Sequence, residues 1–289
     1  MSVAFLILAH QGAPQIGRLA ARLLSAQTSV HLHVDKRASP EVYRHILAAL
    51  PQSPAMRLVP RVASAWASWG IVDATLTGLR SILNSGIPAD HIVIMSGQCY
   101  PLRSVDRIAN FLSSFAGHSF SASWSMPSQV YDGDGGMYRL RYWHMPVLRR
   151  RLRFPVPREY PAGLLPYGGS QFMILSRSHA QRVLQFTDAR PDIVRFHRHV
   201  WIPDEHYTQT LLRNLCADEV IVENLWHMEW KVGAKHPKVY EASDFPRLAN
   251  AASNSSEAGG RSRVKLFARK FDFGSDPRLF DLIDKQLLE

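Results

Sequence analysis

The chain alternates between short apolar runs and longer segments in which apolar residues recur every three or four positions. Apolar runs bounded by turn residues predict buried strands, and the three-to-four spacing predicts helices with one face on a core. The pattern predicts strands at residues 2–9, 30–34, 56–59, 91–95 and 169–175, and helices at 15–24, 40–50, 71–83, 105–115 and 178–186. Strands separated by helices of this length indicate an α/β fold with a mainly parallel sheet flanked by helices.

Polar residues follow the predicted strands directly. His10 and Gln11 come after the first strand, Asp35 and Lys36 after the second, and residues 96–98 after the fourth. In parallel sheets of this kind, ligands bind beyond the carboxyl ends of the strands. We therefore expect these side chains to line one binding site.

The second half of the chain is less regular. Residues 127–166 combine prolines, glycines, arginines and aromatic residues without a sustained period, which predicts a long excursion from the domain and not a free linker. The polar, glycine-containing stretch 254–260 predicts a mobile loop. We expect a single domain over residues 1–289, made of a first half at 1–125 and an embellished second half at 126–289.

Composition supports a soluble globular protein. Of the 289 residues, 46% are hydrophobic and 20% are charged, which excludes collagen-like and intrinsically disordered classes. No apolar stretch approaches the roughly 20 residues that cross a bilayer, and no signal-peptide pattern opens the chain, so we expect a cytoplasmic location. Cys99 and Cys216 are far apart and lack partners at metal-ligand spacing, so we expect neither a disulfide nor a structural zinc site.

The chain carries a formal net charge of +10, with arginines crowded at 149–153 and further basic residues at 261–270. Such an excess predicts attraction to a polyanion: a nucleic acid, an anionic membrane or a nucleotide diphosphate. No nucleic-acid-binding motif accompanies it, so nucleic acid is not an expected partner. A solvated face without a specific partner remains the alternative for residues 149–153.

Three short motifs have the residue types of a catalytic or anion-binding site, and each also has a simpler explanation. Pro203-Asp204-Glu205 precedes a helical segment, so Glu205 is either a general base at a helix N-terminus or part of a helix start that Asp204 caps. Arg269 and Lys270 lie in an apolar frame, which fits either a phosphate site or a surface pair.

The third motif is Asp132-Gly133-Asp134, whose two carboxylates have a spacing that can share one divalent metal. Its turn-like surroundings favour a plain loop, so we expect no metal site there.

Five groups of residues together resemble one family. They are residues 4–11, residues 33–36, Trp69-Gly70 with the helix behind it, residues 95–102, and a later trio at 169–172, 203–205 and 266–272. In this order they resemble the core-2/I-branching β-1,6-N-acetylglucosaminyltransferase family, which includes the peptide O-xylosyltransferases. The resemblance extends over almost the whole chain.

The resemblance implies a modified GT-A fold that transfers N-acetylglucosamine or xylose from a UDP-sugar to a hydroxyl of a glycan or glycoconjugate, with inversion and without a metal. It makes residues 1–125 the nucleotide-binding half and residues 126–289 the acceptor and catalytic half. By resemblance, Glu205 is the catalytic base and Lys270, helped by Arg269, binds the diphosphate. The remaining implied positions are His10, Gln11, Asp35, Lys36 and Ser68 for the nucleotide, and Arg141, Tyr142, Ser170, Gln171 and Trp230 for the acceptor.

Two departures from the family pattern affect these expectations. Cys99 stands where the family has an aspartate, which removes an expected polar contact at that strand end. The sequence also lacks the membrane anchor of the Golgi members. We therefore expect a short bacterial-type relative on the cytoplasmic side of a membrane, with the arginines at 149–153 contacting anionic lipid. A metal-dependent transferase using Asp132 and Asp134, and a non-catalytic sugar-nucleotide or glycan-binding protein, are the alternatives.

Overall fold

The computed structural model describes residues 1–147, 150–231, 233–234, 236–253 and 264–289, with only the backbone at 146, 147, 150 and 151. The loop expected at 254–260 lies outside the described residues, as do Arg149, Arg261 and Arg263 of the basic clusters. In the part that is described, no helix is both long enough and apolar enough to span a bilayer.

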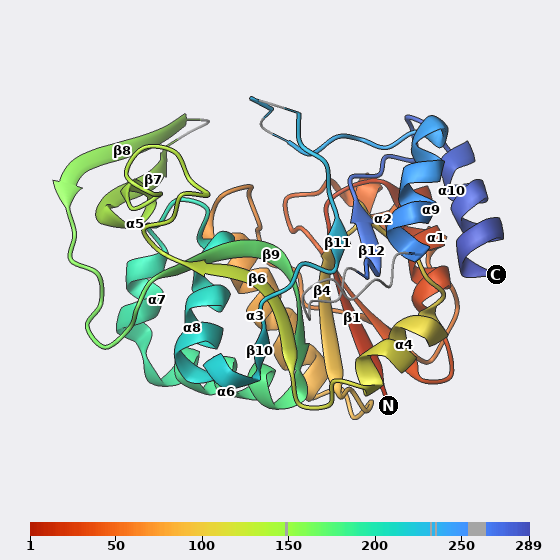
Figure 1. Cartoon of the computed structure of the whole chain (residues 1–289), viewed down its shortest axis with the longest axis horizontal. Helices are drawn as coiled ribbons and strands as arrows, with labels where there is room; N and C mark the ends of the chain where they lie inside the picture. Colours follow the sequence, from red (N-terminus) through yellow and green to blue (C-terminus); the bar gives the residue numbers. More distant parts are fainter. Residues whose placement is uncertain (148–149, 232, 235, 254–263) are drawn as a thin grey trace.

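A seven-stranded sheet forms the centre of the molecule, in the order β10-β6-β9-β4-β1-β2-β3 (Figure 1). Its strands are β1 (Val3–Ala9), β2 (Thr28–Val34), β3 (Met56–Leu58), β4 (His91–Ser96), β6 (Ser119–Ser125), β9 (Tyr167–Ser176) and β10 (Val220–Ile221). β1 pairs in parallel with β2 and β4, whereas β9 runs antiparallel to β4 and β6. The start of β9 therefore lies at the same edge of the sheet as the carboxyl ends of β1, β2 and β4.

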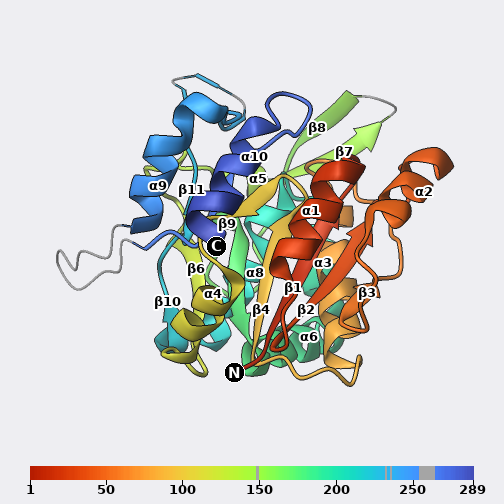
Figure 2. The same ribbon diagram turned by 90° about the vertical axis from the view of Figure 1, so that its right-hand side faces the viewer.

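Helices cover both faces of this sheet (Figure 2). Along β1, Phe5 and Ile7 face one hydrophobic cluster and Leu6 faces another, as the alternation of strand side chains requires. The first cluster includes residues of α1 (Ala13–Leu23), α2 (Pro40–Ala49), α4 (Val105–Ser113), α9 (Phe245–Ser253) and α10 (Arg278–Ile283). The second includes residues of α3 (Trp69–Leu83), α6 (Arg177–Ala189), α7 (Pro191–His197) and α8 (Tyr207–Leu215). The predicted α/β class is confirmed.

Two smaller sheets complete the fold. The first joins β5 (Cys99–Pro101), β11 (Trp226–His227) and β12 (Phe267–Arg269), with Arg269 opposite Cys99 in the antiparallel β12–β5 pair. The second is a hairpin of β7 (Tyr142–Val147) and β8 (Arg150–Pro157), which follows the short helix α5 (Tyr138–Arg141). The expected excursion at 127–166 thus contains a helical turn and a hairpin.

Every element that the apolar pattern predicts is present, with ends that differ by three residues or fewer. The elements that the pattern missed are mostly short, such as β5 and β12, or belong to the irregular second half. Cys99 and Cys216 are both free and buried, in line with the expected lack of a disulfide.

One buried carboxylate joins the C-terminus to the start of the chain. Asp284 lies in the π-helical turn η4 (Asp284–Leu288) and accepts hydrogen bonds from Arg18 Nε at 2.9 Å, Arg22 Nε at 2.8 Å and the Tyr100 hydroxyl at 2.7 Å. The Asp284 side chain is 5% exposed, whereas the neighbouring Asp281, which pairs with Arg18 only, is 70% exposed. The three partners of Asp284 come from α1 and β5, so this carboxylate links η4 to both of these elements.

We expect Asp284→Asn to lower the free energy of unfolding by about 2–3 kcal/mol, because the network loses its buried anion while the arginines keep part of their hydration. Asp281→Asn is the matched control and should cost less than about 1 kcal/mol, since that pair is exposed. Urea unfolding of both variants checks this, and equal losses would contradict a special role for Asp284.

Candidate active site

A cavity of about 260 Å³ opens at the carboxyl ends of β1, β2 and β4. Five of the residues that the resemblance implies line it together: His10, Gln11, Asp35, Gln171 and Arg269. The first three follow β1 and β2, as the sequence pattern predicts. Residues 96–98, expected there from the strand pattern, line the cavity as well. Gln171 reaches the same edge because β9 is antiparallel, with Met173 paired to Ile94 two residues before the end of β4.

Asp35 organises the loops of this cavity. Its Oδ1 accepts hydrogen bonds from the N–H groups of Arg37 at 2.9 Å and Ser64 at 3.0 Å. The carboxylate thereby ties the loop after β2 to the loop before α3, and residues of both loops line the cavity.

Two adjacent cations lie at the cavity, and we call them the cationic wall: Arg269 belongs to the lining, and Lys270, the next residue, lies outside it. Arg269 donates a hydrogen bond to the Ser96 hydroxyl, and its guanidinium lies 5.0 Å from the centroid of the Phe172 ring. Burial lowers the pKa of Lys270, and the charge of Arg269 lowers it further. Burial also lowers the pKa of His10, with Asp35 opposing this and Lys270 and Arg269 adding to it. Two cations in electrostatic range of a cavity residue form a site suited to an anion such as a diphosphate.

Cys99 does not replace the polar contact that the family aspartate would give. Its side chain is fully buried, and its Sγ lies 3.6 Å from Ser96 Oγ. Because Ser96 accepts the hydrogen bond of Arg269, a neutral hydroxyl partners this arginine, and its positive charge is left available to a ligand.

Glu205 ends the 3-10 turn η1 (Pro203–Glu205) and forms an ion pair with Arg139 of α5, with 2.8 Å between Oε2 and Nη1. The Glu205 side chain keeps 36% of its surface exposed. Burial raises its pKa, and the charge and hydrogen bond of Arg139 oppose that rise. A partly exposed carboxylate that a neighbouring arginine helps to keep ionised is suited to accept a proton from an alcohol.

The suggested helix start at Asp204 is wrong in detail. α8 begins at Tyr207 with His206 as its N-cap residue, so Asp204 caps no helix. Ile202, just before η1, has a φ of 53°, in the left-handed region that a β-branched residue rarely adopts, and this turns the chain before α8 can begin. Arg139, and not a helix dipole, is therefore the main positive partner of Glu205.

Gln209 links the turn of Glu205 to the cavity. Its side-chain amide donates to the backbone oxygen of Ser170 at 2.7 Å and to that of Asp204 at 2.9 Å. Ser170 directly precedes Gln171, which lines the cavity. The predicted base and the cationic wall thus lie at the same edge of the central sheet.

Asp204 has a different environment from Glu205. Burial and the neighbouring charge of Glu205 raise its pKa to about 7. Its Oδ1 is buried without a hydrogen-bond partner among the described residues. Two adjacent carboxyl groups with different partners allow Glu205 to hold the negative charge while Asp204 is partly protonated.

Other predicted residues lie outside the cavity lining. Lys36, Arg141 and Trp230 are exposed, and Tyr142 lies beneath the guanidinium of Arg153, 5.3 Å from its ring centroid. Ser68 caps α3, because its Oγ accepts the N–H of Gly70 at 3.2 Å. Capping α3 therefore accounts for Ser68 without a role in nucleotide binding.

The sequence analysis missed Trp66 and Arg139. Trp66 lines the cavity with 67% of its surface exposed, and its ring meets that of Trp201 edge-on at 5.4 Å. This exposed ring offers a flat apolar surface to a sugar or a base. Neither residue belongs to a periodic pattern. The only sequence signal for Trp66 is a tryptophan in the loop just before a predicted helix.

Asp132 and Asp134 are both exposed and neither lines the cavity. Asp134 Oδ1 accepts the backbone N–H of Tyr138 at 3.0 Å, at the start of α5. This contact gives Asp134 a local structural role.

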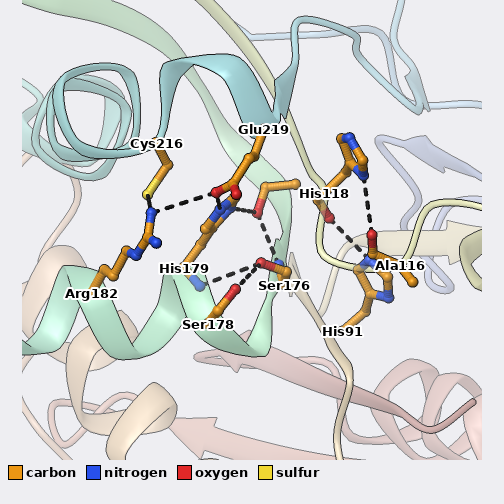
Figure 3. A network of polar contacts seen from close by, with 10 residues as sticks. His91, Ala116, His118, Ser176, Ser178, His179, Arg182, Cys216 and Glu219 are labelled. Atoms are coloured by element: carbon orange, nitrogen blue, oxygen red, sulfur yellow. Dashed lines mark hydrogen bonds and ion pairs between the residues drawn. The ribbon is translucent and has the colours of Figure 1, made fainter.

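At the opposite end of the sheet, His179, Cys216 and Glu219 place three possible metal-ligand atoms within 4.8 Å of one another (Figure 3). This group is not predicted from the sequence, because its members come from separate elements. Arg182 Nη1 lies 3.6 Å from Cys216 Sγ and 3.5 Å from Glu219 Oε2, and His179 Nε2 lies 2.7 Å from the same carboxylate oxygen. Arg182 already supplies the positive charge, so we assign no metal to this group.

Comparison with known proteins agrees with the family resemblance of the motifs. Human xylosyltransferase 2 is 26% identical over 307 residues, covering 99% of this chain and 33% of the relative. Human xylosyltransferase 1 is 25% identical, with 99% and 30% coverage. The chain therefore spans about a third of the length of these curated relatives. The crystal structure of mouse xyloside xylosyltransferase 1 aligns with a TM-score of 0.42 and 13% identity, over 93% of this chain and 97% of that one.

The family model described as Core-2/I-Branching enzyme matches residues 3–248, which include the strand ends, Arg139 and the Pro203–Glu205 turn. Because this match covers most of the chain, the protein belongs to the Core-2/I-Branching enzyme family.

Proposed function

We propose that this protein is an inverting glycosyltransferase that moves a sugar from a UDP-sugar to a hydroxyl of a glycan or glycoconjugate, with Glu205 as general base. The observation that supports this most directly is the ion-paired, partly exposed Glu205 at the same sheet edge as Arg269 and the cavity. The family match and the names of the xylosyltransferase relatives support N-acetylglucosamine or xylose as the sugar.

The proposed reaction is a single displacement. Glu205 takes the proton of the acceptor hydroxyl as the acceptor oxygen bonds to the anomeric carbon, and the bond from that carbon to the diphosphate oxygen breaks. The leaving UDP keeps the electron pair of that bond. Lys270 and Arg269 stabilise its growing negative charge, a role that fixed cations fill when they are positioned before the reaction.

We further propose that the reaction needs no divalent metal, because these two cations supply positive charge next to the cavity. A metal-dependent transferase using Asp132 and Asp134 is the enzymatic alternative. A non-catalytic sugar-nucleotide or glycan-binding protein is the other, and release of UDP in the presence of an acceptor separates it from both enzymes.

Replacing the proposed base should slow turnover selectively. We expect Glu205→Gln to lower kcat by about 10²- to 10⁴-fold, the usual contribution of a general base, with little change in UDP affinity. Glu159→Gln, at an exposed glutamate, is the matched control and should keep full activity. Steady-state kinetics with calorimetric UDP binding checks this, and unchanged turnover of Glu205→Gln would refute the assignment.

The Arg139–Glu205 pair should control the acidic side of the pH–activity profile. Glu205 must be ionised to act as a base, and Arg139 holds its pKa down against burial. In Arg139→Gln the pKa of Glu205 rises, so we expect activity to be lost at a higher pH as the solution is acidified. Arg139→Lys keeps the charge and should shift the profile less. A kcat profile that is the same in all three proteins would exclude this role for Arg139.

The cationic wall should bind UDP when metals are removed. We expect calorimetry in excess EDTA to detect UDP binding to the unaltered protein, and Lys270→Gln to weaken it by about 10- to 100-fold, as for the loss of a charged hydrogen bond. Lys285→Gln, on the exposed C-terminal turn, is the matched control. Binding and turnover that appear only when a divalent metal is added would favour the Asp132 and Asp134 alternative.

A further inference from the structure

The β7–β8 hairpin projects from the end of the molecule that holds the cavity, away from the N-terminus (Figures 1 and 2). Its base is fixed to the body. The His144 N–H donates to the His199 backbone oxygen at 2.9 Å, and Arg158 Nη1 donates to the Phe196 backbone oxygen at 2.9 Å. The base of the hairpin is therefore anchored to the domain by hydrogen bonds.

One face of the hairpin is apolar. At its base, the ring of Trp143 also packs on the body, 4.9 Å from the ring of His199, and the guanidinium of Arg158 lies 4.8 Å from its centroid. Trp143 pairs with Phe154 and Met145 with Leu152, so these four side chains share one face of the hairpin. They are 37%, 43%, 39% and 44% exposed respectively. None of them belongs to a hydrophobic cluster formed by the described residues.

The other face of the hairpin carries His144, which is turned toward the body of the protein. His144, between Trp143 and Met145, is 6% exposed, and its Nε2 lies 3.1 Å from the Tyr138 backbone oxygen. A hairpin of a soluble domain normally buries its apolar face and exposes its polar one. Here Met145, Leu152 and Phe154 stay exposed while His144 is buried, and exposed apolar patches of this kind mark interaction surfaces.

The positive charge of the hairpin sequence indicates what kind of partner this apolar face binds. Residues 142–158 contain five arginines and no aspartate or glutamate. Arg153 is exposed and lies opposite His144 in the hairpin, on the other face from the four apolar side chains. A second copy of the chain would bring the same positive charge to the contact and be repelled. An anionic bilayer offers both an acyl region for the apolar side chains and negative headgroups for the arginines. Tryptophan is also enriched at this depth of a membrane.

We propose that the β7–β8 hairpin docks the protein on anionic membranes, with Trp143, Met145, Leu152 and Phe154 at the boundary between headgroups and acyl chains. This docking has a consequence that rests on the proposed function. β7 directly follows α5, whose Arg139 pairs with Glu205, so a docked hairpin holds the catalytic base near the membrane surface. The acceptor is then a hydroxyl of a membrane-borne glycoconjugate.

The test is co-sedimentation of the full chain with vesicles of phosphatidylcholine, with or without phosphatidylglycerol. We expect binding to the anionic vesicles that weakens as salt is raised. The triple variant Met145→Ser, Leu152→Ser, Phe154→Ser should bind at least about tenfold more weakly. Arg153→Gln should bind about fivefold more weakly at low salt.

A matched control replaces three exposed apolar residues elsewhere, Leu58, Leu165 and Val222, with serine, and should bind vesicles like the unaltered protein. UDP binding without vesicles should be the same in all variants, which shows that each has folded. Equal binding by the two triple variants, or no preference for anionic vesicles, would overturn the proposal. Because vesicle binding is measured without turnover, failure of Glu205 as a base would leave this result intact.

Discussion

The proposed general base must stay ionised although its surroundings bury it, and the Arg139–Glu205 ion pair meets this demand. Burial raises the pKa of Glu205 while Arg139 limits the rise. The backbone oxygen of Arg139 also accepts the N–H of Trp201 at 3.0 Å, just ahead of the turn that contains Glu205. The charge of the base and the position of its loop therefore depend on one residue of α5.

The opposite charges of the site are kept on separate elements. Glu205 pairs with Arg139 from α5, whereas Arg269 arrives on β12 and donates to the hydroxyl of Ser96. Among the ion pairs of the described residues, none joins Glu205 to Arg269 or Lys270. If these groups met, Glu205 would occupy the two cations, and less of their positive charge would be left for an anion. The antiparallel entry of β9 at the cavity edge, fixed by Gln209, provides the spacing between them.

The sequence predicts the parts of this molecule in which contacts are local or periodic. The apolar runs indicate β1, β2 and β4, and the rule for strand ends places His10 and Asp35 in the cavity. The sequence does not predict the role of Arg139, because its partner Glu205 is 66 residues away and α5 is a single turn, too short to show a helical period of apolar residues. The start of α8 was misplaced because the positive φ of Ile202, a tertiary constraint, delays the helix to Tyr207. Cofactor and metal requirements, the sugar and the compartment remain predictions.

The irregularity of residues 127–166 has a physical explanation in the hairpin. Trp143, Met145, Leu152 and Phe154 do alternate with polar neighbours, which is the period of a strand, but the sequence cannot say which of the two faces meets the body of the protein. The structure assigns the polar face to the inside through the buried His144. In water this orientation leaves apolar surface exposed at a free-energy cost, which contact with an acyl region removes. The pattern of this segment, which is poor for a soluble domain, is the one that the proposed membrane docking requires.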